Sequence, residues 1–355
     1  MEKLCSTWLL VLLSLITACT STAPSLRVVA SDAPTFVPPE LREPAERETA
    51  PSCKLESDEK HPAGFYPTDA WPKGEVVLTF DDGPHPGKTP KVLDLLKKHQ
   101  MPATFFLVGR AITGKTHALV QRMVAEGHTL ASHSYNHDVG MAVRNHGERS
   151  VEYIRGQHEV TRILIELALV AKSGEDFDAL FVRVFSVKAG TYLPAGSLRT
   201  RWRTFAERHA EVLVERGFRD GRRPYSVVYS RPPAGTPYVG LSTPDQKKLY
   251  DSALARLGLL NVMWHGESGD TNPTRKHELG YLTANLEYHS RRGGVLLIHD
   301  YIRTDALGSA LAAMASNPKL KVVPIEVAVQ RKYGCGAARL AEVLAGQGSA
   351  VVAGR

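Results

Sequence analysis

The chain has 355 residues, of which 43% are hydrophobic and 23% are charged. These values are near the averages of globular proteins and exclude a fibrous or wholly disordered chain, and the length suits one large domain with appendages. The formal net charge is +7. Since neither a dense run of Lys and Arg nor a nucleic-acid-binding motif accompanies this charge, we expect no nucleic-acid partner, and no protein partner is indicated.

The first 19 residues have the features of an export signal. Lys3 precedes an apolar stretch from Trp8 to Ile16 that is too short to span a bilayer. The segment is similar to a bacterial lipoprotein signal, and Ile16-Thr17-Ala18-Cys19 resembles its lipobox, so Cys19 is the expected lipidation site. An ordinary cleaved secretory signal is the alternative. Either signal leads to export, and lipidation would anchor the protein to a membrane of the bacterial envelope, on the periplasmic or cell-surface side.

Residues 20–70 are rich in Pro, Ser, Thr, Ala and Glu and show no regular periodicity. This composition predicts a disordered, flexible tether, with ordered structure starting near Trp71. Cys53 and Cys335 remain after Cys5 leaves with the signal and Cys19 takes the lipid. The export compartment permits a disulfide between them, but the sequence leaves open whether it forms.

Strand and helix patterns alternate between residues 71 and 330. The expected strands cover 76–80, 103–108, 129–131, 226–229, 261–264, 295–298 and 322–325, and the expected helices cover 89–99, 116–126, 149–169, 244–257, 277–291 and 305–315. Repeated β-α units predict a parallel sheet with right-handed crossovers. About seven units suit an α/β fold of the irregular (β/α)7-barrel type, open or closed.

Two segments depart from this alternation. Residues 170–225 contain an Arg-rich stretch and predict an insertion on the barrel rim, where Tyr192 or Trp202 could add binding surface. Residues 331–355 form a C-terminal tail that can be helical. The predicted organisation is therefore signal (1–19), linker (20–70), one domain (71–330) with its insertion, and tail.

Two adjacent carboxylates, Asp81 and Asp82, follow the apolar strand Val76–Phe80 and precede Gly83-Pro84. Barrels of this type place their chemistry at the carboxyl ends of the strands. Since neighbouring side chains on a strand point to opposite sides, one carboxylate could hold a metal while the other serves another role. The alternative is an ordinary turn, for which Asp-Gly-Pro is common.

A second motif follows the strand at 129–131. His133 and His137 are four residues apart, so both can reach one metal ion from a helical turn or a compact loop. Surface histidines with no ligand are the alternative. A zincin motif is excluded, because Ser134 stands where that motif requires Glu.

Three further polar groups follow predicted strands. Arg231 precedes Pro232-Pro233 and could hold a carboxylate bidentately. Asp270 follows the strand at 261–264, and His299 ends the strand at 295–298. Core packing does not readily explain so many polar side chains at one rim, so the set indicates an active site.

These motifs, in this order, resemble those of the polysaccharide deacetylases, the NodB-homology group or carbohydrate esterase family 4. The resemblance rests on Thr79-Phe80-Asp81-Asp82-Gly83-Pro84, His133-Ser134-x-x-His137, Arg231-Pro232-Pro233 and Leu297-Ile298-His299-Asp300. It covers about residues 74–330 apart from the insertion. It implies a deformed (β/α) barrel, a divalent metal with zinc as the expected ion, and hydrolysis of acetyl groups, usually N-acetyl groups on amino sugars.

The resemblance also assigns roles at the metal. Asp82, His133 and His137 would be the metal ligands, an oxygen and two nitrogens that suit zinc with an open position for water. Asp81 would be the general base that takes a proton from that water. Arg231 would orient Asp81 and keep it ionised.

The remaining roles concern the leaving group and the acetyl group. His299 would be the general acid that protonates the leaving amine. Asp270 would brace Arg231. The backbone N–H of Ala234 would help to bind the oxyanion, and Leu297 would line the pocket for the acetyl methyl group.

Two departures from the family motifs affect the expected identity of the substrate more than the expected type of reaction. Ala234 stands where an aromatic residue often follows the double proline, and Asp270-Thr271 stands where Asp-Trp is usual. The first hypothesis is a hydrolase that removes N-acetyl groups from an amino-sugar polymer such as peptidoglycan or chitin. The alternatives are an O-acetyl esterase and a catalytically silent, polysaccharide-binding lipoprotein.

Overall fold

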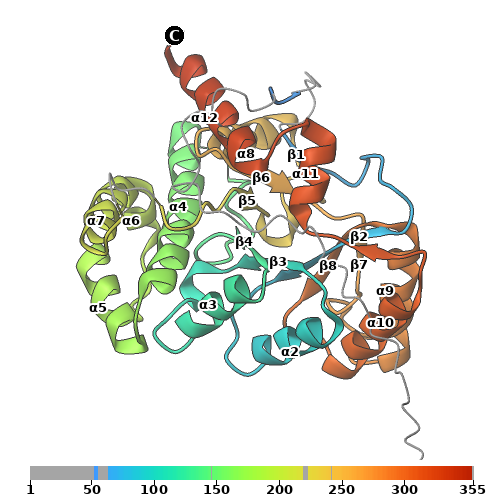
Figure 1. Ribbon diagram of the computed structural model, residues 1–355. Helices are drawn as coiled ribbons and strands as arrows, with labels where there is room; N and C mark the ends of the chain where they lie inside the picture. The colour runs from blue at the N-terminus through green and yellow to red at the C-terminus, as the bar shows by residue number, and fades with distance from the viewer. Residues whose placement is uncertain (1–51, 55–62, 145, 219–222, 241, 354–355) are drawn as a thin grey trace, which may run out of the picture. The chain divides into compact units, whose positions relative to one another are not determined.

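The computed structural model describes residues 52–54, 63–144, 146–218, 223–240 and 242–353 (Figure 1). The expected signal, Cys19 and most of the expected tether lie outside these residues. Within the described part of the chain, no helix is both long enough and apolar enough to cross a membrane.

A parallel sheet forms the centre of the domain (Figure 1). Its strands are hydrogen-bonded in the order β1-β6-β5-β4-β3-β2-β8-β7, and β9 also pairs with β2. They are β1 (Gly64–Phe65), β2 (Glu75–Asp81), β3 (Ala103–Leu107), β4 (Thr129–Ser132), β5 (Tyr229–Ser230), β6 (Leu260–Val262), β7 (Gly266–Glu267), β8 (Gly294–His299) and β9 (Lys321–Val322).

The segment from β6 to β7 joins the two ends of the strand order. β6 and β7 are separated by residues 263–265, yet β6 lies beside β1 and β7 lies beside β8. The backbone N–H of Met263 donates to the Phe65 carbonyl, and that of His265 donates to the Val295 carbonyl, both at 2.8 Å. The sheet therefore curls into an irregular barrel, which confirms the predicted fold class.

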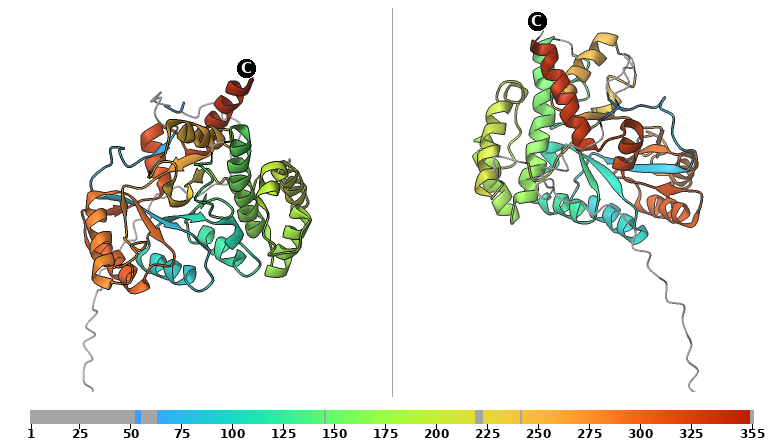
Figure 2. Two further views of the ribbon diagram at one scale, coloured as in Figure 1. Left: turned by 180° about the vertical axis from the view of Figure 1, so that it is seen from behind. Right: turned by 45° about the horizontal axis from the view of Figure 1, so that its top comes forward.

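Helices cover the outer face of the sheet (Figure 2). They are α2 (Thr89–His99), α3 (His117–Ala125), α4 (Glu148–Val170), α8 (Pro244–Ala255), α9 (Leu279–Arg292) and α10 (Thr304–Ser316). Two further helices, α11 (Ile325–Tyr333) and α12 (Ala337–Ala353), pack in a second core with residues of the inner face. Side chains on β2 alternate, so Val76, Leu78 and Phe80 pack in the larger core with the helices. Val77 packs in a second core with Phe106. By the same alternation, Thr79 and Asp81 share the inner face with Val77.

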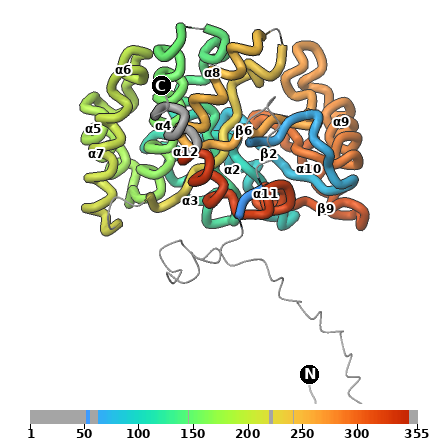
Figure 3. Tube along the Cα trace, turned by 90° about the horizontal axis from the view of Figure 1, so that it is seen from above, coloured from blue at the N-terminus to red at the C-terminus, as the bar shows by residue number. Residues whose placement is uncertain are grey.

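The insertion forms three helices, α5 (Gly174–Phe185), α6 (Ala195–Thr200) and α7 (Trp202–Glu215). They lie against α4, on the opposite side of the barrel from α9 and α10 (Figure 3). The approach of α6 to α4 is close, because a Cβ atom added at Gly156 would lie 1.7 Å from the Leu198 carbonyl oxygen. Trp202 is buried, so it adds no binding surface, whereas Tyr192 is exposed.

Both ends of the predicted domain need correction. Gly64 and Phe65 pair with β6, and a disulfide joins Cys53 to Cys335, so ordered structure begins before Trp71. The strand expected at 322–325 ends early because Pro324 fixes φ and starts α11 instead. The C-terminal segment is helical, and Leu340 and Leu344 are buried in the second core, so this segment belongs to the domain.

Candidate active site

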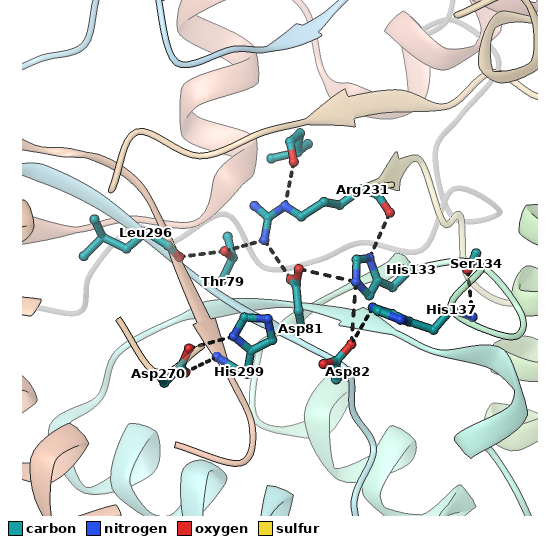
Figure 4. Close-up of polar contacts among 11 residues, drawn as sticks. Thr79, Asp81, Asp82, His133, Ser134, His137, Arg231, Asp270, Leu296 and His299 are labelled. Atoms are coloured by element: carbon teal, nitrogen blue, oxygen red, sulfur yellow. Dashed lines mark hydrogen bonds and ion pairs between the residues drawn. The ribbon is translucent and has the colours of Figure 1, made fainter. Parts of the chain in front are cut away.

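The two carboxylates at the end of β2 point in different directions (Figure 4). Asp81 is the last residue of the strand, and its side chain is buried inside the barrel. Asp82 has a φ of 74°, a left-handed conformation that ends the strand and turns its carboxylate away from that of Asp81. Local geometry therefore gives the two acids separate surroundings.

His133 follows β4, and its protonation is set by a backbone contact. Its Nδ1 lies 2.9 Å from the Arg231 carbonyl oxygen. Since a carbonyl can only accept, Nδ1 holds the proton and Nε2 presents its lone pair. Burial lowers the pKa of His133 to about 3, which keeps the ring neutral, and Nε2 lies 3.7 Å from Oδ1 of Asp82.

His137 is brought to the same place by a tight turn. Ser134 and His137 both have positive φ, 66° and 58°, and the His137 N–H donates to the Ser134 hydroxyl at 3.2 Å. Nε2 of His137 lies 3.2 Å from Oδ1 of Asp82. One ligand atom from each of Asp82, His133 and His137 lies within 4.8 Å of the others.

This cluster fits a divalent cation. Oδ1 of Asp82 is buried, and within the described part of the chain it accepts no hydrogen bond. A buried carboxylate oxygen without a partner is costly, so a cation is the natural neighbour. One carboxylate and two imidazoles form one of the donor sets of catalytic zinc sites.

Arg231 holds Asp81 from inside the barrel. Its Nη1 donates to Asp81 Oδ1 at 2.7 Å and to the Thr79 hydroxyl at 2.9 Å, and its Nε donates to the Val262 carbonyl at 2.7 Å. Burial raises the pKa of Asp81, and the Arg231 charge opposes that rise. The structure thus places the two residues as the resemblance implies, while Thr79 is a partner that the sequence reading missed.

His299 lies beside Asp81 because of strand register. β2 and β8 are parallel neighbours in which Asp81 and His299 are directly opposed. The His299 backbone N–H and its Nδ1 both lie 2.8 Å from the Asp270 carboxylate oxygens, so Asp270 accepts from both. Burial lowers the pKa of His299, but the hydrogen bond to Asp270 and the nearby carboxylates outweigh burial and raise it to about 9.

The expectation that Asp270 braces Arg231 is therefore wrong. The Ser268 N–H donates to the Leu297 carbonyl at 2.9 Å, which sets the segment after β7 alongside β8 and delivers Asp270 to His299. Arg231 follows β5, on another part of the barrel. The order of the motifs along the chain does not show that Asp270 lies next to His299 rather than next to Arg231.

Ala234 follows the double proline after β5, and Leu297 lies on β8. Ala234 is exposed with a φ of 53°, and within the described residues its N–H donates to no protein acceptor. Leu297 is two residues before His299 on β8 and therefore faces the same side. Sequence reasoning missed Tyr301, which is 43% exposed and stacks on His299 with ring centroids 5.0 Å apart.

Part of the chain is similar to known polysaccharide deacetylases. Residues 69–167 match the polysaccharide deacetylase family model. A chitooligosaccharide deacetylase of Sinorhizobium fredii is 49% identical over 77 residues, which cover 21% of this chain and 35% of the relative. A peptidoglycan-N-acetylglucosamine deacetylase of Bacillus cereus is 42% identical over 91 residues, covering 26% of this chain and 32% of the relative.

The matched segment therefore spans about a third of each relative's length, 35% and 32%. Among solved structures, a family 4 carbohydrate esterase of Streptomyces lividans in complex with acetate is 20% identical. It has a TM-score of 0.45, with coverage of 73% of this chain and 96% of that one. The family match includes Asp81, Asp82, His133 and His137.

Proposed function

We propose that this chain, whose residues 69–167 match the polysaccharide deacetylase family model, hydrolyses N-acetyl groups on an amino-sugar polymer. One observation supports the proposal above the others. The cluster of Asp82, His133 and His137 lies beside the buried carboxylate of Asp81, and His299, whose pKa is raised to about 9, lies next to Asp81 on the neighbouring strand. Amide hydrolysis needs this combination of a base, an acid and an electrophile.

The base side of the reaction belongs to Asp81. Its Oδ1 is held by Arg231 at 2.7 Å, and its Oδ2 lies 3.6 Å from Nε2 of His133. The free oxygen therefore faces the cation cluster, where it can accept a proton from the attacking water. A cation at the cluster would add to Arg231 in lowering the pKa of Asp81 and keeping it ionised.

The acid side belongs to His299. With a pKa of about 9, the ring is protonated at neutral pH and can donate a proton to the leaving amine nitrogen. Asp270 holds Nδ1, so the ring presents Nε2 to the site. The products are acetate and a free amino sugar.

The cation and two further groups would act on the acetyl group. A divalent cation, with zinc as the expected ion, would polarise the acetyl carbonyl and lower the pKa of the attacking water. The Ala234 N–H would donate to the carbonyl oxygen as it gains charge. Leu297 would contact the acetyl methyl group.

We also propose that Cys19 is lipidated and anchors the domain to a bacterial envelope membrane. Residues 1–19 supply the argument, since they have the short apolar segment and the Ile-Thr-Ala-Cys sequence of a lipoprotein signal. Labelling with a fatty-acid analogue in a bacterial host should mark the native chain and leave Cys19→Ser unmarked. Equal labelling of both would contradict the anchor.

Acetate release from a panel of acetylated glycans, with zinc-reconstituted protein, tests the proposed activity. We expect release from N-acetylated chitooligosaccharide or peptidoglycan strands, and loss of release in Asp81→Asn. Asp305→Asn, an exposed carboxylate on α10, is the matched control. Release from acetylated xylan alone would favour an O-acetyl esterase, and polymer binding without release under any metal would favour a silent binding protein.

A further inference from the structure

A cavity of about 720 Å³ is lined in part by Asn136 and Asp138, the sequence neighbours of His137. Its walls come from the loop after His137, from the first turns of α4 and from the insertion. The lining residues that matter here are Asn136, Asp138, Arg144, Arg149, Tyr192 and Arg199. The motifs of the deacetylase site do not account for it.

The cavity is continuous with the ligand loop. Asn136 lies between His133 and His137 in sequence, and Asp138 directly follows His137. The Asn136 side-chain amide donates to the Tyr192 hydroxyl at 2.6 Å, which ties the insertion to that loop. A polymer with one acetyl group at the cation cluster would therefore extend its neighbouring sugar over this cavity.

The charge of the cavity is positive. Arg144 pairs with Asp138, but in the described part of the chain the side chains of Arg149 and Arg199 form neither an ion pair nor a hydrogen bond. Arg149 also lies in the first turn of α4, whose positive end faces the same space. Glu148, the acid of that turn, is paired with Arg256. The unpaired charge in the cavity is therefore cationic.

Packing fixes the spacing between the two unpaired arginines. Arg199 follows Leu198, whose carbonyl oxygen lies against Gly156 of α4 so closely that a Cβ there would be 1.7 Å away. Arg149 lies on the same helix as Gly156, two turns nearer its start. The insertion thus holds the backbone of Arg199 at a set position relative to α4, the helix that contains Arg149.

We propose that this cavity binds a carboxylate on the sugar next to the acetylated one, so that the preferred substrate is an acidic amino-sugar polymer. The inference rests on the proposed deacetylase function. Two arginines that line one cavity from different elements suit a carboxylate, which each guanidinium can hold through paired N–H donors. The carboxylate can belong to a uronic-acid ring or to a lactyl ether substituent, and both present the same group.

Steady-state acetate release tests this proposal with length-matched N-acetylated oligosaccharides. One is neutral, one has a ring carboxylate and one has a lactyl carboxylate. We expect KM to be about tenfold lower for at least one acidic substrate than for the neutral one. In Arg149→Gln/Arg199→Gln that ratio should collapse to about one, and Arg149→Lys/Arg199→Lys should restore part of it. Arg291→Gln, an exposed arginine on α9, should keep the native ratio.

A binding measurement separates this proposal from the proposed activity. Calorimetry with the deacetylated acidic oligosaccharides should show binding that weakens in the Gln double variant and with added salt. Charge-dependent binding without acetate release would contradict the activity and retain the cavity assignment. Equal KM values for neutral and acidic substrates, or a native ratio in the Gln double variant, would overturn the cavity assignment alone.

Discussion

The rim of the barrel and the helical insertion position their polar residues in different ways. At the rim, Asp81 and His299 are opposed by the register of β2 and β8, and each is held by a buried partner. On the insertion, helix packing against α4 positions the backbone of Arg199, and a hydrogen bond from Asn136 holds the exposed Tyr192. The comparison indicates that sheet register sets the chemistry, while attached helices can set which polymer reaches it.

The largest expected loss follows removal of the acid at the rim. His299→Gln should lower kcat by about 10²–10⁴-fold, because the leaving amine then lacks its proton donor. Zinc binding should persist, since none of the three clustered ligand residues is changed. Acetate release and metal titration measure the two effects. A kcat within tenfold of the native value would contradict the role of His299 as the general acid.

A smaller loss should follow removal of the charge that holds that acid. Asp270→Asn should lower kcat by roughly 10–100-fold, a size typical of groups that orient another residue. Asp270 is the main group that raises the pKa of His299 to about 9. The high-pH limb of the kcat profile should therefore move to lower pH. An unchanged limb would show that the Asp270–His299 contact does not control this titration.

A substitution at the contact between α4 and the insertion should lower the stability of the fold rather than act on the chemistry directly. Gly156→Ala should lower the free energy of unfolding by about 1–3 kcal/mol, because its methyl group would overlap the Leu198 carbonyl. Gly280→Ala on α9 is the matched control, since nothing lies within 4 Å of its added Cβ. Denaturant unfolding compares the two. Equal stabilities would contradict the close contact between α4 and α6.

An effect limited to part of the pH range concerns a buried carboxyl group between α4 and the insertion. Oε1 of Glu166 lies 3.2 Å from Arg223 Nη1, and Oε2 lies 3.2 Å from His209 Nε2. Burial raises the pKa of Glu166 from 4.5 to about 7, although Arg223 opposes this rise. Between those pH values the folded state binds more protons than the unfolded state, so this contribution to stability is lost as pH rises.

Glu166→Gln should remove that dependence. The free energy of unfolding of the native chain should fall relative to the variant between pH 4.5 and 7, by on the order of 2–3 kcal/mol at most. Glu215→Gln, an exposed residue of α7, is the matched control. Urea unfolding across this range measures the difference, and parallel curves for native and Glu166→Gln proteins would exclude a buried Glu166 proton.

The barrel and its polar rim could be predicted because a short local sequence pattern marks the end of each strand. An apolar strand followed by Asp81-Asp82, and a short strand followed by His133 and His137, place these side chains at one edge. The sequence did not predict the Asp270–His299 contact, because the order of the motifs along the chain does not determine which strands are neighbours in the sheet. The start of the domain was missed because β1 is two residues long and Cys53 depends on a partner 282 residues away.

The insertion was the least predictable region. Its Arg-rich composition indicated surface, but not that α6 contacts α4 at Gly156 or that Tyr192 reaches Asn136. Such contacts depend on helix orientation, which local patterns do not determine. The sequence alone also gave no reason to prefer Arg199 over its basic neighbours as a binding residue.

Calorimetric titration of metal-free protein with zinc tests the central claim most directly. The geometry predicts one ion per chain, with affinity reduced by at least about tenfold in Asp82→Ala and in His137→Ala. Asp94→Ala, an exposed carboxylate on α2, should bind zinc as the native chain does. Undiminished zinc binding in both Asp82→Ala and His137→Ala would contradict the cation site and the account built around it.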